Sequence, residues 1–68
     1  MVKAGERIRV TSVDTAKQPG LAVGDVGIIL DVDDSGEDIM TVKFPLSEFH
    51  NLSPYNMVEA GITFEFMP

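Results

Sequence analysis

Apolar and polar residues alternate along most of this 68-residue chain, and that alternation favours a β-rich fold. A period of two places successive side chains on opposite faces of a strand, whereas an amphipathic helix repeats its apolar residues every three or four positions. No window of the chain has the helical spacing, and no repeat or linker divides it. We therefore predict a single all-β domain over residues 1–68.

Four segments carry the alternation and predict strands. In residues 6–11, Ile8 and Val10 share one face, while Arg7 and Arg9 share the other. In residues 24–32, one face is predicted to hold Val26, Ile28, Leu30 and Val32. Gly27 lies within that strand and indicates a bulge or a tight bend.

The third strand is predicted to point Met40, Val42 and Phe44 inward, with Ile39, Thr41 and Lys43 on its outer side. In the last strand, Ile62, Phe64 and Phe66 share a face. We favour the interpretation that this strand completes the core. The alternative is a spare strand that forms a homodimer through the segment from Ile62 to Met67.

The connections have the composition of turns and loops. Residues 33–37 predict a hairpin with Gly36 at positive φ, and residues 14–23 predict a longer loop. Residues 45–56 predict irregular chain with at most one short turn of helix. A long first loop, an acidic hairpin and about five short antiparallel strands are typical of a small SH3-like barrel; an OB-fold is the alternative.

Several segments resemble known families of small barrels: residues 5–14, Pro19 and residues 24–29, 32–36 and 42–44. Together they resemble SH3-like domains encoded by phages and mobile elements, whose functions are unknown. More weakly, they resemble electron-transport accessory barrels, namely the stromal photosystem I subunit and the variable subunit of ferredoxin–thioredoxin reductase. The resemblance extends to about Glu59 and implies the SH3-like fold and a phage origin.

The chain has no cysteine, so disulfides and thiolate metal sites are excluded, and its stability depends on packing or on a partner. It has no apolar run typical of a signal peptide or a membrane span, so we expect a cytoplasmic protein that does not contact membranes. The net charge of −6 disfavours binding to phosphate backbones.

The segment from Asp31 to Gly36 matches the first half of a calcium loop, D-x-D-x-S-G. However, Val42 occupies the position where the bidentate glutamate would stand, and strands flank the motif. We interpret the motif as a hairpin turn and predict no metal and no cofactor; weak calcium binding is the alternative.

His50, with Ser47 and Ser53 nearby, supplies residue types found in hydrolytic triads. We expect a chain of this length to lack a cleft of typical ligand-binding volume, roughly 300 Å³ or more. The sequence therefore predicts no enzyme, and His50 is interpreted as a loop histidine that hydrogen-bonds backbone or water.

Six acids and no base lie between residues 25 and 38, and such a surface favours a basic partner. We predict a non-enzymatic protein-interaction module that binds a host or complex protein; one version inhibits a nucleic-acid-processing enzyme. The residues expected to contact that partner are Asp31, Asp33, Asp34, Glu37, Asp38, Phe49, His50 and Tyr55.

Two other functions stay open. A basic face could bind nucleic acid as KOW-like domains do, and it would consist of Lys3, Arg7, Arg9 and Lys17. The structural alternative to nucleic-acid binding is that the two arginines form ion pairs across the sheet with Glu6, Asp25 or Asp31. The remaining function is that of an accessory subunit in an electron-transfer complex.

Overall fold

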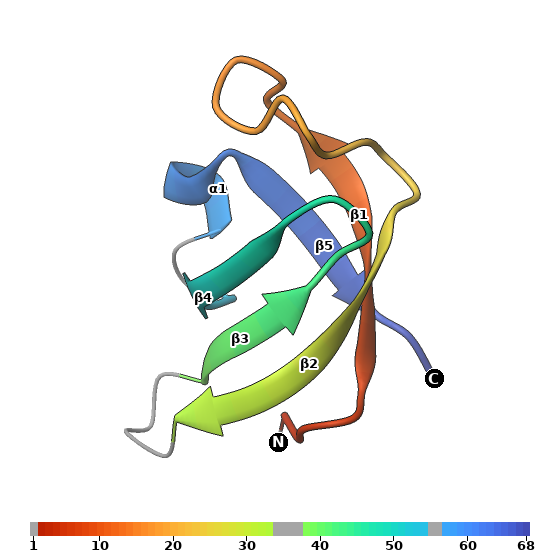
Figure 1. Cartoon of the computed structure of the whole chain (residues 1–68), viewed down its shortest axis with the longest axis vertical. Coiled ribbons are helices and arrows are strands. Elements are labelled where there is room, and N and C mark those ends of the chain that lie inside the picture. The colour runs from red at the N-terminus through yellow and green to blue at the C-terminus, as the bar shows by residue number, and fades with distance from the viewer. Residues whose placement is uncertain (1, 34–37, 55–56) are drawn as a thin grey trace.

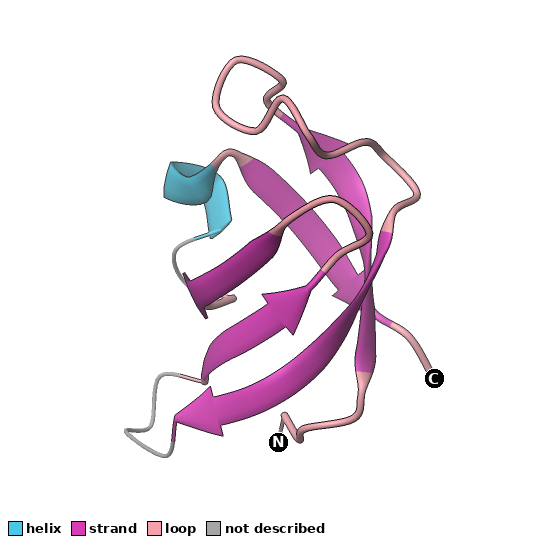
Figure 2. Ribbon diagram, viewed as in Figure 1, coloured by secondary structure: helices cyan, strands magenta, loops and turns pink. Residues whose placement is uncertain are grey.

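The computed structural model describes residues 2–33, 38–54 and 57–68, and it confirms the predicted all-β, SH3-like architecture (Figures 1 and 2). Its elements are β1 (Arg7–Val13), β2 (Val26–Asp33), β3 (Ile39–Lys43), β4 (Glu48–Leu52), α1 (Met57–Ala60) and β5 (Ile62–Phe66). Within these described ranges, no helix is long and apolar enough to cross a membrane.

The five strands form one antiparallel sheet in the order β4-β3-β2-β1-β5. Figure 1 shows that the sheet curls, so that β3 and β4 lie in front of β1 and β5. The sheet is a half-barrel, and β4 and β5 are its two edges.

The concave side of the sheet holds the hydrophobic core. β1 points Ile8 and Val10 inward and leaves Arg7 and Arg9 exposed, as predicted. The predicted inward face of β3 is also confirmed. The buried core residues are Ile8, Val10, Leu21, Ile29, Met40, Val42, Phe44, Leu52 and Ile62.

β2 differs from its predicted pattern. Ile28 and Leu30 are about half exposed, at 47% and 51%, whereas Ile29 is buried and Val32 packs against the core. The predicted common face of this strand is therefore wrong. Gly27 and Ile29 occupy the inner face, because Gly27 packs closely on the core. A bulge at Leu30, where β2 advances by two residues while β3 advances by one, then turns Val32 to the same side.

Gly27 lies on the inner face of β2 and serves packing instead of a bulge. A Cβ atom added there would stand 2.6 Å from Val42 Cγ1 and 2.7 Å from Phe44 Cε1. Those distances are too short for any side chain, so only glycine lets β2 approach these two core residues.

β4 forms where irregular chain was predicted, so that prediction is wrong. Only Leu52 of its five residues is fully buried, and a bulge interrupts its pairing with β3. The strand therefore lacks the alternation of apolar and polar residues from which a strand is predicted. The helical turn α1 begins at Met57, just after the segment in which at most one turn was expected.

The loop between β1 and β2 docks on the junction of α1 and β5. Gln18 Nε2 donates to the Ala60 carbonyl at 2.9 Å, and Asp14 N–H donates to the Gly61 carbonyl at 2.6 Å. β5 then pairs with β1 and contributes Ile62 and Phe64 to the core, as favoured from the sequence. Phe66, expected to complete the core with them, is instead 43% exposed. The hairpin glycine Gly36 lies outside the described residues.

Candidate functional site

Two bulges flank Thr41, in the middle of β3. On one side, the β2 bulge sets Asp31 opposite Thr41. On the other side, β4 advances by three residues, from Leu52 to Phe49, while β3 advances by two. The bulge thus leaves His50 and Asn51 beside Thr41. Bulges re-aim side chains and are frequent next to functional sites.

The outer face of the sheet carries a depression of about 450 Å³ at this point, open to solvent. Its lining residues are Asp31, Val32, Asp33, Ile39, Thr41, His50 and Asn51. Its volume exceeds the roughly 300 Å³ of a typical ligand-binding cleft, but the hollow is open and lacks the enclosure of such a cleft. The two bulges that deform the outer face explain why a small sheet can hold it.

Strand periodicity and register position the side chains around the depression. Asp31 and Asp33 are two residues apart on β2, so they point to the same side. Their Cα partners on β3 are Thr41 and Ile39. Asp31 Oδ1 accepts the Val32 N–H at 3.0 Å, and this hydrogen bond orients the carboxylate.

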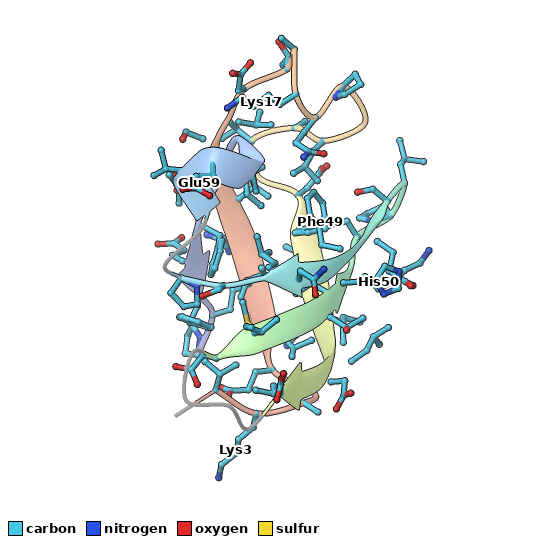
Figure 3. All side chains as sticks on the ribbon, turned by 90° about the vertical axis from the view of Figure 1, so that its left-hand side faces the viewer. Lys3, Lys17, Phe49, His50 and Glu59 are labelled. Carbon is cyan, nitrogen blue, oxygen red and sulfur yellow. The ribbon has the colours of Figure 1, made fainter. Side chains whose placement is uncertain are left out.

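His50 lies on β4, not in a loop as predicted, and stands at the solvent side of the strand (Figure 3). Its Nε2 is 3.1 Å from Glu48 Oε2, two residues earlier on the same strand. This contact holds the imidazole at the rim of the depression.

The structure brings together three of the residues predicted to contact a partner, namely Asp31, Asp33 and His50. Asp38 precedes β3 at a left-handed φ of 52° and does not line the depression. Asp tolerates that conformation better than most residues do.

Phe49 points toward the core and not toward solvent. Its ring packs edge-to-face on Phe44, with centroids 5.6 Å apart. The remaining predicted contact residues, Asp34, Glu37 and Tyr55, lie outside the described residues.

Three further lining residues were not predicted to belong to the site: Ile39, Thr41 and Asn51. The alternation of β3 placed Ile39 and Thr41 on the outer side, so the sequence contained a signal for them. Asn51 had none, because β4 itself was not predicted.

Nothing in the described part of the chain resembles a metal centre: no three His, Asp or Glu side chains there are grouped to hold an ion. Two members of the calcium-like motif, Ser35 and Gly36, fall outside that part.

The predicted basic residues do not form one patch. Figure 3 shows Lys17 and Lys3 at opposite ends of the molecule. Lys17 Nζ lies 3.5 Å from the Glu59 carbonyl, beside α1. Arg9 Nη1 lies 3.6 Å from Glu65 Oε1 on β5, while Arg7 faces Ile28 on β2.

The acids expected to pair with the arginines instead accept backbone N–H groups. Glu6 Oε1 accepts from Lys3 at 2.6 Å, and Asp25 Oδ2 accepts from Ala22 at 3.0 Å. The carboxylate beside Arg9 is instead that of Glu65, its cross-strand partner on β5.

No family model, curated protein or solved structure matches this chain.

Proposed function

We propose that this protein is a non-enzymatic interaction module that binds a basic protein through the outer face of β2, β3 and β4. This surface, the β2–β4 face, is defined by Asp31, Asp33, Ile39, Thr41 and His50. The observation that supports the proposal is the depression in which two β2 carboxylates meet a β4 histidine across β3.

The negative charge of the β2–β4 face indicates that its partner is positively charged. Asp31 and Asp33 stand side by side on an exposed surface of a protein whose net charge is −6. Such a surface attracts arginine and lysine side chains and accelerates their encounter with it. Ile39 adds apolar area to the same hollow.

The openness of the depression favours a macromolecular partner. Sites for small molecules enclose most of the ligand within apolar walls, whereas this hollow is open and lined mainly by polar side chains. We propose a phage-type accessory or regulatory protein whose partner is a host protein. Inhibition of a nucleic-acid-processing enzyme follows if the carboxylates occupy its phosphate-binding site.

Nucleic-acid binding has less support, because the cations are dispersed. Lys3 and Lys17 lie at opposite ends, and Arg9 is beside a carboxylate. No observation on the described residues favours an electron-transfer complex.

The test compares two variants that each lose two negative charges. Asp31→Asn/Asp33→Asn changes the β2–β4 face, and the amide oxygen introduced at position 31 can still accept the Val32 N–H. Glu59→Gln/Glu65→Gln is the control on α1 and β5. Each protein is used to capture partners from a lysate of the source cells, and the affinity for the captured protein is then measured.

We expect the face variant to bind the captured protein about tenfold or more weakly, and the control to bind like the wild type. Affinity should fall as salt rises. Equal loss in both variants would mean that only net charge matters, and recovery of nucleic acid in place of a protein would contradict the proposal.

A further inference from the structure

The backbone of β5 offers hydrogen-bonding groups on the side that faces away from β1. At one end of the strand, Met67 N–H donates to the Arg7 carbonyl at 2.9 Å; at the other, the Gly61 carbonyl accepts the Asp14 N–H. Antiparallel strands alternate between bonded and non-bonded positions. The backbone groups of Ile62, Phe64 and Phe66 therefore point outward.

No strand of the described chain pairs with this outer edge, because β5 is the last strand of the sheet. The edge is also apolar. Phe66 is 43% exposed, and its ring contacts Phe64 edge-to-face, with centroids 5.7 Å apart. Natural proteins rarely leave such an edge without a bulge, a proline or several charges.

We propose that β5 pairs antiparallel with β5 of a second copy, around a twofold axis at Phe64. In this register, Phe64 faces its own counterpart, and Ile62 faces Phe66 of the second copy. Each position with outward backbone groups is then paired, and each apolar side chain of the strand meets an apolar one.

The placement of charge selects this register over its neighbours. With the axis at Phe64, Glu65 faces Thr63 of the second copy. With the axis one position later, two Glu65 carboxylates would stand opposite each other, which is destabilising. With the axis one position earlier, Phe66 would face a residue outside β5 of the second copy and would have no strand residue as its partner.

A second copy fits better than a foreign strand because the pattern of β5 is the same read in either direction, apolar–polar–apolar–polar–apolar. In a twofold contact the β5 edges of the two copies pair with each other, so no β5 edge is left for a third copy and the assembly stops at a dimer. The other edge, β4, is bulged and does not offer the same surface. Association also suits a domain of this size, which has a small core.

The dependence on salt separates this contact from the proposed β2–β4 face. Two copies of net charge −6 repel each other, so screening should strengthen the dimer. Binding of a basic partner to the β2–β4 face should instead weaken. β1 and β5 separate the new edge from β2 in the strand order, so both contacts can be tested independently.

The first experiment uses the purified full chain. Sedimentation velocity is recorded from about 10 μM to about 1 mM, at low and at high salt, with backbone amide exchange followed by NMR over the same range. We expect a monomer–dimer equilibrium that shifts toward the dimer with salt. The amides of Ile62, Phe64 and Phe66 should exchange more slowly as concentration rises.

The second experiment compares Phe66→Pro with Phe66→Val. Both remove the ring, but only proline removes the outward N–H, which β1 does not use. We expect proline to weaken the dimer about 30-fold relative to valine, since the bond is lost twice per dimer. Circular dichroism verifies that both variants fold. A monomer at about 1 mM, or equal dimer affinity in two folded variants, overturns the proposal.

Discussion

The two edge strands, β4 and β5, have the same length and opposite designs. In β4, only Leu52 is fully buried in the core, and Glu48 and His50 lie on the outer side. A bulge interrupts the pairing of β4 with β3. β5 is regular, sends two apolar side chains into the core and has one charged residue. The first edge is interrupted, and the second is continuous.

This difference assigns each edge a different use. A bulge and charged side chains prevent a foreign strand from adding to an edge, and the same bulge turns side chains onto the outer face. β4 therefore contributes to binding by its face, with His50 at the rim of the depression. β5 keeps an open row of backbone groups, so any contact it makes is through its edge.

The largest expected effect tests how β4 is held. Leu52 is fully buried and anchors the strand, so Leu52→Ala should lower the free energy of unfolding by about 2–5 kcal/mol. Leu46→Ala is the control, because Leu46 is 83% exposed and its truncation should cost almost nothing. Urea denaturation measures both. A similar cost for the two leucines would show that Leu52 is not the anchor.

The next effect concerns the junction before β5. Gly61 has φ of +85°, and a Cβ atom there would lie 2.9 Å from Lys17 Cβ. Gly61→Ala should therefore destabilise the fold by about 1–2 kcal/mol and loosen the docking of the first loop. Gly20 has open space around it and serves as control. The melting temperatures of Gly61→Ala and Gly20→Ala are compared by thermal unfolding. Equal melting temperatures would contradict a strained junction.

The sequence predicted the strands in which one choice of face was clearly better. In β1 and β3 every inward residue is apolar, and the outward ones are mostly charged or polar. β2 contains the run Ile28, Ile29 and Leu30, in which either face is apolar, so alternation alone could not orient it. The close approach of Gly27 to β3 and the core decided the face, and that is a tertiary contact.

The candidate site could be predicted only in part. Asp31, Asp33 and His50 were singled out by charge and chemistry, but their meeting depends on the order of β2, β3 and β4 and on two bulges. Neither bulge has a sequence signal here, because no glycine or proline marks Leu30 or the residues after Phe49. Local patterns thus identified the residues, and only pairing brought them together.

The smallest effect concerns hydroxyl contacts on the outer side of β5. Thr63 Oγ1 lies 2.8 Å from Thr11 Oγ1 and 2.6 Å from Ser12 Oγ, where β1 carries its own bulge. Thr63→Val keeps the shape and β propensity but loses both hydrogen bonds. We expect a loss of about 0.5–1.5 kcal/mol, small because water can replace exposed partners.

Thr41→Val is the matched control on β3, since the Thr41 hydroxyl has no hydrogen-bond partner among the described residues. Chemical denaturation should find it nearly neutral for stability. If Thr41→Val costs as much as Thr63→Val, the loss reflects a general preference for threonine on this sheet. If only Thr63→Val is costly, hydroxyl contacts stabilise the β1–β5 pair, and Thr41 is free of that structural role and available to a partner.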